Sequence, residues 1–460
     1  MQNFAKKTAL LGPALLTFFF SLTANIASAE PAQGSRIKSA SQFQVLPHRQ
    51  RVAPQNRLLN ERLEHLLPDL MQQAKLDMWL VINREYAEDP VYFSLVPQPT
   101  FAARRTTMLV FNRLEDGSVE KLSVNTYPFG DPYQSYWSGG DIDAQWQALA
   151  QLIEEKKPDT IGINQSTHWP EADGLTKGLY DRLTAALPDR YVERLQPAEQ
   201  LVVRWLETRT QSELSILSTA VSLARGVIAE AFSASTITPD ATTTDDVAWY
   251  IRQRFEELGL DAWFMPYVTF QRAGNQCTED MPFCSAGKGL IKRGDVLHTD
   301  VGICYLSQCT DTQEMAYVLK LNEQSAPDGL KNALRTGNKW QDLLTQEFIT
   351  GRSGNEILAA TRSASQQANI DSSTYTHPIG FFGHAPGPTI GMWDNQGSTK
   401  IKGDWLLYPD TAYAIEGNIK QVLPEWDNQT VQIMLEQTAY FDGSEVIYAA
   451  GRQTQWHLIR

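Results

Sequence analysis

The stretch GDVLHTDVG (residues 294–302), followed closely by CTD (309–311), decides how the C-terminal half of this chain folds. If the chain folds back around residues 305–306, Asp300 stands directly opposite Asp311 on one face of a β-hairpin. Like charges directly opposite each other destabilise a sheet. Such a pair therefore requires raised pKa values or a bound cation.

A second acidic pair has the same arrangement further along the chain. The segments AYAIE (412–416) and IMLE (433–436) read as apolar strands that end in glutamate, and a turn centred on Trp426 opposes Glu416 to Glu436. A metal site explains two such pairs more simply than four shifted pKa values. The sequence therefore predicts a carboxylate-rich metal centre.

The first 29 residues have the three parts of a secretory signal peptide. Two lysines precede an apolar core over residues 9–22, and ASA at 27–29 is a small-residue cleavage site. A transmembrane anchor is the alternative, but the apolar stretch is short and Pro13 interrupts it. We therefore expect export to the periplasm or the extracellular space, with a mature chain that begins near Glu30.

Length and charge narrow the class of protein. A chain of 460 residues is too long for one ordinary core, so two domains are expected. The net charge of −13, or about −15 without the two signal lysines, argues against nucleic acid or an anionic membrane as partner. No apolar run beyond the signal reaches spanning length, so no stable membrane insertion is expected after cleavage.

The order of the expected elements divides the chain into four segments. They are a signal peptide (1–29), a polar linker or arm (30–55), an N-terminal domain (56–204) and a C-terminal domain (205–460). Strands and helices alternate in the N-terminal domain, which is typical of an α/β fold. In the C-terminal domain, capping signals at Thr243 and Ser353 precede helices and then strand-rich stretches, which indicates an α+β fold with paired helices covering one curved antiparallel sheet.

The four cysteines permit two disulfide bridges in an exported protein. Cys277 and Cys284 could close a small loop, and Cys304 and Cys309 fall on the same strand face near the expected turn. For the second pair, a bridge and two buried free thiols stay equally open. The chain has no C-x₂-C pair, which excludes a zinc finger.

A single imidazole is expected beside the carboxylates. The sequence lacks H-E-x-x-H, G-x-S-x-G and P-loop lysine motifs, which excludes common zinc proteases, α/β-hydrolases and nucleotide hydrolases. Glycines flank His384 within THPIGFFGHAPG (376–387), and close backbone approach there would hold its ring at a fixed point. The expected metal ligands are Asp300, Asp311, His384, Glu416 and Glu436.

These five residues, in this order, resemble the ligand set of the pita-bread metallopeptidases, the group of methionine aminopeptidase, Xaa-Pro aminopeptidase and prolidase. The likeness rests on five short motifs, which are DVG (300–302) for D-x-G, TD (310–311) for S/T-D, GHAPG (383–387) for G-H-x-x-G, AIEG (414–417) for T-I-E-P and LEQT (435–438) for V-E-D-T. It spans residues 205–450, and residues 56–204 resemble the creatinase-type N-terminal domain of the Xaa-Pro branch.

The resemblance implies a pita-bread catalytic domain, a peptide substrate, a homodimer and two divalent metal ions. Asp311 and Glu436 would bridge the ions, Asp300 would complete one site, and His384 with Glu416 the other. Hard oxygen donors with one imidazole suit Mn²⁺, with Co²⁺, Zn²⁺ and Fe²⁺ as competitors. A hydroxide bridging the ions would attack the peptide bond, and Glu416 would relay its proton to the leaving amine.

Departures from the family pattern leave the substrate open. Gln313 and Glu314 stand where related peptidases usually carry Arg, and the place of a third His, an oxyanion donor, reads GMWD (391–394). His377 or His298 is expected to supply that donor. The expected activity is removal of N-terminal residues from peptides, as by Xaa-Pro aminopeptidase or prolidase. A pita-bread enzyme acting on a small amidino or sulfonium compound and a non-catalytic peptide-binding member are the alternatives.

Overall fold

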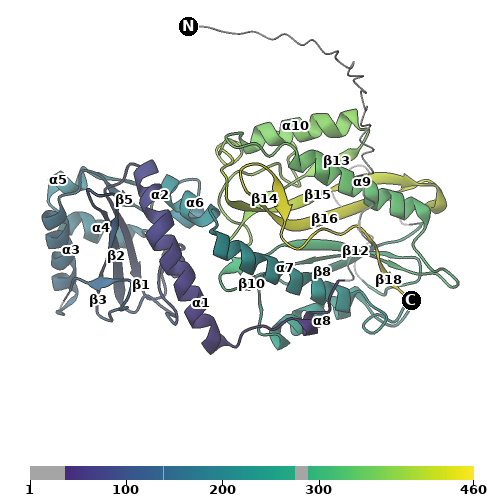
Figure 1. The fold of residues 1–460 in the computed structure, drawn as a ribbon, viewed down its shortest axis with the longest axis horizontal. Helices are drawn as coiled ribbons and strands as arrows, with labels where there is room; N and C mark the ends of the chain where they lie inside the picture. Colours follow the sequence, from purple (N-terminus) through teal and green to yellow (C-terminus); the bar gives the residue numbers. More distant parts are fainter. Residues whose placement is uncertain (1–36, 138, 275–288) are drawn as a thin grey trace, which may run out of the picture. The chain divides into compact units, whose positions relative to one another are not determined.

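The computed structural model describes residues 37–137, 139–274 and 289–460 (Figure 1). The predicted signal peptide and the predicted Cys277–Cys284 loop lie outside the described residues. Export and that disulfide therefore stay predictions.

The N-terminal region contains a six-stranded sheet covered by helices on both faces. The strand order is β4-β3-β2-β1-β5-β6. The strands are β1 (Met78–Arg84), β2 (Thr106–Arg113), β3 (Val119–Asn125), β4 (Gln134–Ser135), β5 (Ile161–Ile163) and β6 (Leu195–Pro197). Alternate residues of β1 face opposite ways: Leu80 packs with α3 (Ile142–Lys156) and α4 (Lys177–Ala186), whereas Trp79 packs with α2 (Leu67–Gln73) and α6 (Glu199–Glu207). The α/β prediction is confirmed.

Two segment boundaries differ from the sequence-based expectation. Helix α1 (His48–Glu61) begins inside the predicted linker, and α6 runs through the predicted boundary between residues 204 and 205. The first residues of α1 are polar and do not show the apolar periodicity of a helix. Contacts with other parts of the chain hold this segment in place. The buried Arg51 donates to the carbonyl oxygens of Leu46 at 2.7 Å and Gly259 at 2.6 Å.

The C-terminal region is built on a nine-stranded sheet. Its main order is β13-β15-β16-β12-β9-β8, with β14 on β15, β17 on β16 and β18 on β12. The strands are β8 (Tyr267–Gln271), β9 (Val296–Val301), β12 (Thr312–Val318), β13 (Asp371–Thr374), β14 (His377–Ile379), β15 (Thr411–Leu423), β16 (Gln429–Phe441), β17 (Val446–Tyr448) and β18 (His457–Ile459). A separate small sheet joins β7 (Asp261–Ala262), β10 (Ile303–Tyr305) and β11 (Gln308–Cys309).

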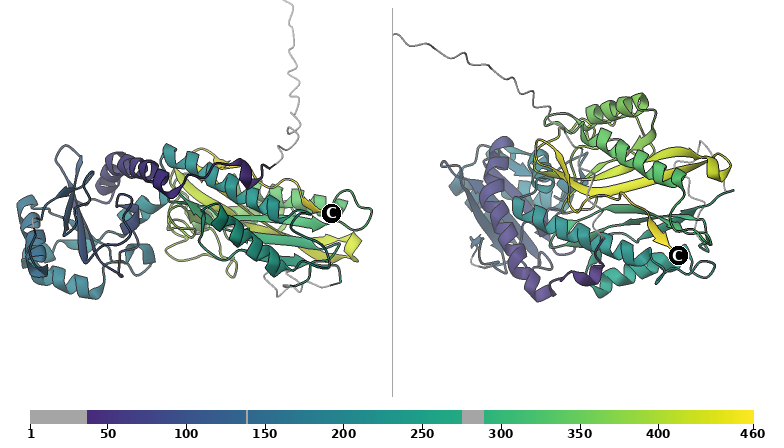
Figure 2. Two further views of the ribbon diagram at one scale, coloured as in Figure 1. Left: turned by 90° about the horizontal axis from the view of Figure 1, so that it is seen from below. Right: turned by 45° about the vertical axis from the view of Figure 1, so that its right-hand side comes forward.

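Two pairs of helices cover the large sheet, as expected for an α+β pita-bread fold. Helices α7 (Gln211–Ala231) and α8 (Thr244–Glu257) pack with β8, β9 and β12, whereas α9 (Asp328–Thr345) and α10 (Gly354–Gln367) pack with β13, β15 and β16. In Figure 2 the long yellow hairpin of β15 and β16 lies beside the green strands of the same sheet. Capping boxes begin α8 at Thr243 and α10 at Ser353, as predicted.

Helix α7 contradicts the expectation that no apolar run beyond the signal peptide reaches membrane-spanning length. Within the described part of the chain it is the one helix long and apolar enough to cross a membrane, with a mean hydropathy of 1.4 over its best window. However, 61% of that window is buried inside the protein. The apolar side chains of α7 therefore belong to the hydrophobic core.

One acidic pair has the expected register and the other does not. Glu416 pairs directly with Glu436, as predicted. Asp300 pairs with Gln313 instead of Asp311, so that prediction is wrong by two positions. The turn lies one residue further on, at residues 306–307, where both residues adopt positive φ angles of 50° and 64°. A two-residue turn of this kind matches the twist of the strands and sets the register.

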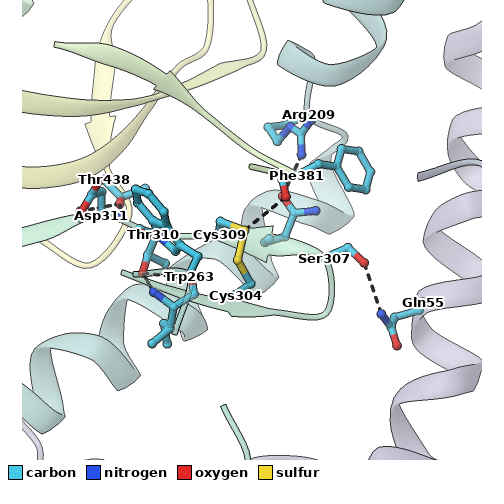
Figure 3. The surroundings of a disulfide bond; sticks show 12 residues. Gln55, Arg209, Trp263, Cys304, Ser307, Cys309, Thr310, Asp311, Phe381 and Thr438 are labelled. Atoms are coloured by element: carbon cyan, nitrogen blue, oxygen red, sulfur yellow. Dashed lines mark hydrogen bonds between the residues drawn. A yellow bond between two sulfur atoms is a disulfide. The ribbon is translucent and has the colours of Figure 1, made fainter. Parts of the chain in front are cut away.

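The β10–β11 hairpin carries a disulfide bond. Cys304 and Cys309 face each other in register and are bridged, so the bridge is confirmed over the free thiols (Figure 3). The backbone N–H of Cys309 also donates to the carbonyl oxygen of Gly380 at 2.8 Å, and its Sγ lies 3.2 Å from that of Phe381. The bridged hairpin therefore supports the loop that follows His377.

Replacing Cys304 and Cys309 together with Ala should lower the free energy of unfolding by about 2 kcal/mol, because the bridge closes only a short loop in the unfolded chain. Chemical denaturation of the purified protein measures the change. Unaltered denaturation midpoints would show that the bridge does not form in solution.

Candidate metal centre

Two adjacent rows of side chains on one sheet face build the site. The first row crosses four strands through Asp300, Gln313, Glu436 and Glu416. The second row lies two residues along the strands and contains His377, Ala414, Thr438 and Asp311. Residues paired across a sheet share a face, and so do residues two apart on a strand, which brings the four acids together. Because Ala414 carries only a methyl group, it leaves room for the ring of His377.

His377 points into the acid cluster. Its Nε2 lies 3.7 Å from Asp311 Oδ2, 3.8 Å from Glu416 Oε2 and 3.6 Å from Glu436 Oε1. Its Nδ1–H donates to the carbonyl oxygen of Pro378 at 3.0 Å, which leaves the Nε2 lone pair facing the carboxylates. Burial lowers the pKa of His377 to about 4, so its ring is neutral at neutral pH. A neutral nitrogen lone pair among carboxylate oxygens is the arrangement of a metal ligand.

Six residues group into three possible metal-binding triads, in each of which the ligand atoms lie within 4.8 Å of one another. The triads are Asp311 with His377 and His384, His377 with Glu416 and Glu436, and Asp300 with Asp311 and Glu436. The structure thus assembles all five predicted ligands and adds His377.

Several atoms of this cluster have no hydrogen-bond partner. Among the described residues, Nε2 of His377, both carboxylate oxygens of Glu436 and Oδ1 of Asp300 are buried and unpartnered. Each such group costs about 1–3 kcal/mol when it is left unsatisfied. Divalent cations would satisfy all of them at once, and oxygen donors with one or two imidazoles suit such ions. The residues therefore fit a metal.

Burial raises the pKa values of all four acids. It raises the pKa of Asp300 to about 7 and those of Asp311, Glu416 and Glu436 well above their usual range. Repulsion among the carboxylates adds to the effect of burial. Without a cation, the cluster keeps protons near neutral pH.

His384 lies at the exposed edge of the cluster. Its ring stands perpendicular to that of His377, with centroids 4.7 Å apart, and edge-on to Trp263 at 5.1 Å. A Cβ at Gly302 or Gly383 would lie 2.0–2.1 Å from the indole of Trp263. These glycines therefore admit Trp263, which the sequence analysis did not single out. Figure 3 shows the Trp263 indole N–H donating to the carbonyl oxygen of Thr310, at 2.9 Å.

His298, the other predicted donor, does not belong to any of the three triads. It lies buried on β9, and its Nε2 contacts Gln313 Oε1 at 2.8 Å. Gln313 Nε2 in turn donates to Glu416 Oε1 at 2.5 Å. His298 therefore reaches the acids only through an amide.

Glu314 belongs to a different cluster from the four acids. It accepts from Arg225 of α7 at 2.6 Å and lies 2.5 Å from His457 Nε2. Burial alone would raise the pKa of Glu314, but these two neighbours outweigh it and lower that pKa to about 2. Where related peptidases usually carry Arg, this chain thus has a glutamate on β12, and the arginine that pairs with it lies on helix α7.

Comparison with known proteins agrees with this geometry. The sequence profile of metallopeptidase family M24 matches residues 215–440. The C-terminal region of this chain is therefore a metallopeptidase family M24 domain. The family binds divalent metals, so the acid and histidine cluster is the M24 member's candidate metal centre. No curated protein matches the sequence.

Solved structures share the fold of this M24 metallopeptidase over most of its length. An X-Pro aminopeptidase from Thermotoga maritima has a TM-score of 0.61 at 16% identity, covering 85% of this chain and 99% of its own. A Xaa-Pro dipeptidase from Bacillus anthracis has 0.58 at 17%, covering 87% and 100%. The dipeptidase PepE from Mycobacterium ulcerans has 0.56 at 16%, covering 88% and 98%. At these identities the likeness shows the fold.

Metal binding should stabilise the protein more as the pH rises. The raised carboxyl pKa values mean that the metal-free folded state holds more protons than the unfolded state, so their contribution to stability is lost as pH rises through about 7, the pKa of Asp300. A divalent ion replaces those protons. Thermal unfolding with and without Mn²⁺ should therefore show a larger rise in Tm at about pH 7.5 than at about pH 5.5. An equal rise at both pH values would contradict this electrostatic account.

Proposed function

We propose that this chain is an exported M24 peptidase that holds two divalent metal ions and hydrolyses N-terminal residues from peptides, in the manner of an Xaa-Pro aminopeptidase or prolidase. The observation that carries the proposal is the convergence of three carboxylates, those of Asp311, Glu416 and Glu436, on the unpartnered Nε2 of His377. Mn²⁺ is the preferred ion, because most of the donors are hard oxygens.

The triads suggest how the residues share the ions. Asp311, Glu436 and His377 each belong to two triads, and of these only the two carboxylates have two donor oxygens, which supports the predicted role of Asp311 and Glu436 as bridges. His377 takes the ligand role predicted for His384, because its Nε2 faces three carboxylates while its Nδ1 is held by the backbone. His384, at the exposed edge, takes the role of the oxyanion donor.

The ions would polarise the scissile carbonyl and lower the pKa of an attacking water. Glu416 is placed to move that proton to the leaving amine, since Gln313 holds one of its oxygens and the other faces His377. The imidazole of His384 would donate to the carbonyl oxygen as negative charge develops there. The indole of Trp263 keeps that ring oriented.

Export and the disulfide support each other. A bridge between Cys304 and Cys309 persists in oxidising compartments, which is where the signal-like segment 1–29 would send the chain. The periplasm or the extracellular space is therefore the proposed location.

Substituting either bridging acid should abolish turnover, because each contributes to both ions. We expect no detectable peptide hydrolysis by the Asp311→Ala or Glu436→Ala variant. Metal analysis of the same samples should show the loss of bound ions. Wild-type activity in either variant would mean that the centre has been misassigned.

Variants of His377 and His384 should differ in their affinity for metal. His377→Ala should weaken Mn²⁺ binding at least about tenfold, because it removes a ligand, whereas His384→Ala should lower kcat with Mn²⁺ affinity nearly unchanged. Calorimetric titration and steady-state kinetics measure the two effects. The reverse pattern would restore His384 as the ligand.

The activity itself is tested by reloading metal-free protein with Mn²⁺, Co²⁺ or Zn²⁺ and supplying X-Pro and X-Pro-Z peptides. We expect release of the N-terminal residue of these peptides. We also expect N-terminal sequencing of the mature protein to begin at Glu30. A peptide library should be assayed beside small amidino and sulfonium compounds. Turnover of those compounds alone, or stoichiometric metal without any turnover, would contradict the proposed peptidase.

A further inference from the structure

A buried chain of hydrogen bonds ends on Glu416. It begins at His298 on β9, passes through the side-chain amide of Gln313 on β12, and reaches Glu416 Oε1 on β15, with distances of 2.8 and 2.5 Å. His298 and Gln313 are only 5% and 4% exposed. The chain thus lies on the same sheet face as the acids, and His298 stands on the other side of the first row from His377.

Donor and acceptor chemistry fixes the direction of this chain. A glutamate that ligates a metal is a carboxylate and can only accept, so the NH₂ group of Gln313 faces Glu416 and the amide oxygen faces His298. His298 must then donate from Nε2, which agrees with its Nδ1 having no partner. His298 is therefore not available as an oxyanion donor.

The position of Gln313 in the row matters as well. It stands between Asp300 and Glu436 in the sheet register, so an acid there would add a fifth carboxylate to the cluster. The neutral amide instead supplies a donor. It holds Oε1 of Glu416 and leaves Oε2, which lies 3.8 Å from His377 Nε2, as the oxygen directed at the metal position.

We propose that Gln313, oriented by His298, is a positioning residue that limits Glu416 to one metal-directed oxygen and fixes its orientation for proton transfer. This inference rests on the proposed function, because it concerns how a ligand of that centre is held. Partners that orient metal ligands affect affinity or activity by about 10- to 100-fold.

The test compares Mn²⁺ affinity, measured by calorimetry, with kcat on the same peptide. Gln313→Met, which keeps the length and removes the amide, should lower both about tenfold or more. His298→Met should lower both, and His298→Gln should restore them, since its amide can donate in place of Nε2–H. The double variant His298→Met/Gln313→Met should be no worse than Gln313→Met, because His298 acts only through Gln313.

Gln145→Met is the matched control. Gln145 is a buried glutamine of α3 in the N-terminal region, and its side-chain amide donates to the carbonyl oxygens of Thr106 at 2.9 Å and Val124 at 2.8 Å. It should cost stability and leave Mn²⁺ affinity within about twofold of wild type. If Gln313→Met does not fold, the His298 pair tests the same chain with Gln313 intact.

Metal binding by the wild-type protein distinguishes a failure of the proposed function from a failure of this inference. Wild-type protein that binds no Mn²⁺ would overturn the proposed function and this inference together. Wild-type affinity and kcat in Gln313→Met, a His298→Gln variant as impaired as His298→Met, or multiplying losses in the double variant would overturn the inference alone.

Discussion

The structure depends on holding four buried or half-buried carboxylates together on one face of a β-sheet. Asp300, Glu436 and Glu416 share one row, and Asp311 lies in the next row on the same face. Such a cluster destabilises the metal-free fold, because burial and mutual repulsion oppose ionisation. Bound cations would remove this repulsion, because the same carboxylates would serve as their ligands. The cost is tolerated because the surrounding sheet is long, antiparallel and packed by paired helices, so the acids cannot move apart.

Neighbouring groups hold the two histidines of the site in fixed orientations. The Cys304–Cys309 bridge and the N–H of Cys309 hold the loop after His377, and the carbonyl of Pro378 fixes its tautomer. Trp263, admitted by two glycines, sets the ring of His384 at the exposed edge. A rigid outer shell of this kind lets a carboxylate cluster bind metal with little rearrangement.

Much of the fold and of the donor set could be predicted from the sequence, and each miss has a physical reason. The Glu416–Glu436 register followed from a turn centred on Trp426. The Asp300 register was misplaced because two non-glycine residues adopt positive φ at the β10–β11 turn, a conformation that nothing in their identity signals. Glycines around His384 indicated a fixed imidazole, but Gly383 accommodates Trp263. The strand position of His377 beside Ala414 was the signal that was missed.

The acid cluster is proposed to bind a pair of cations. The most direct measurement is elemental analysis of the protein, purified without chelator and then dialysed against metal-free buffer. We predict two divalent ions per chain in the wild type. Fewer than one ion per chain, or equal retention when Glu436 is replaced by Gln, would contradict the claim.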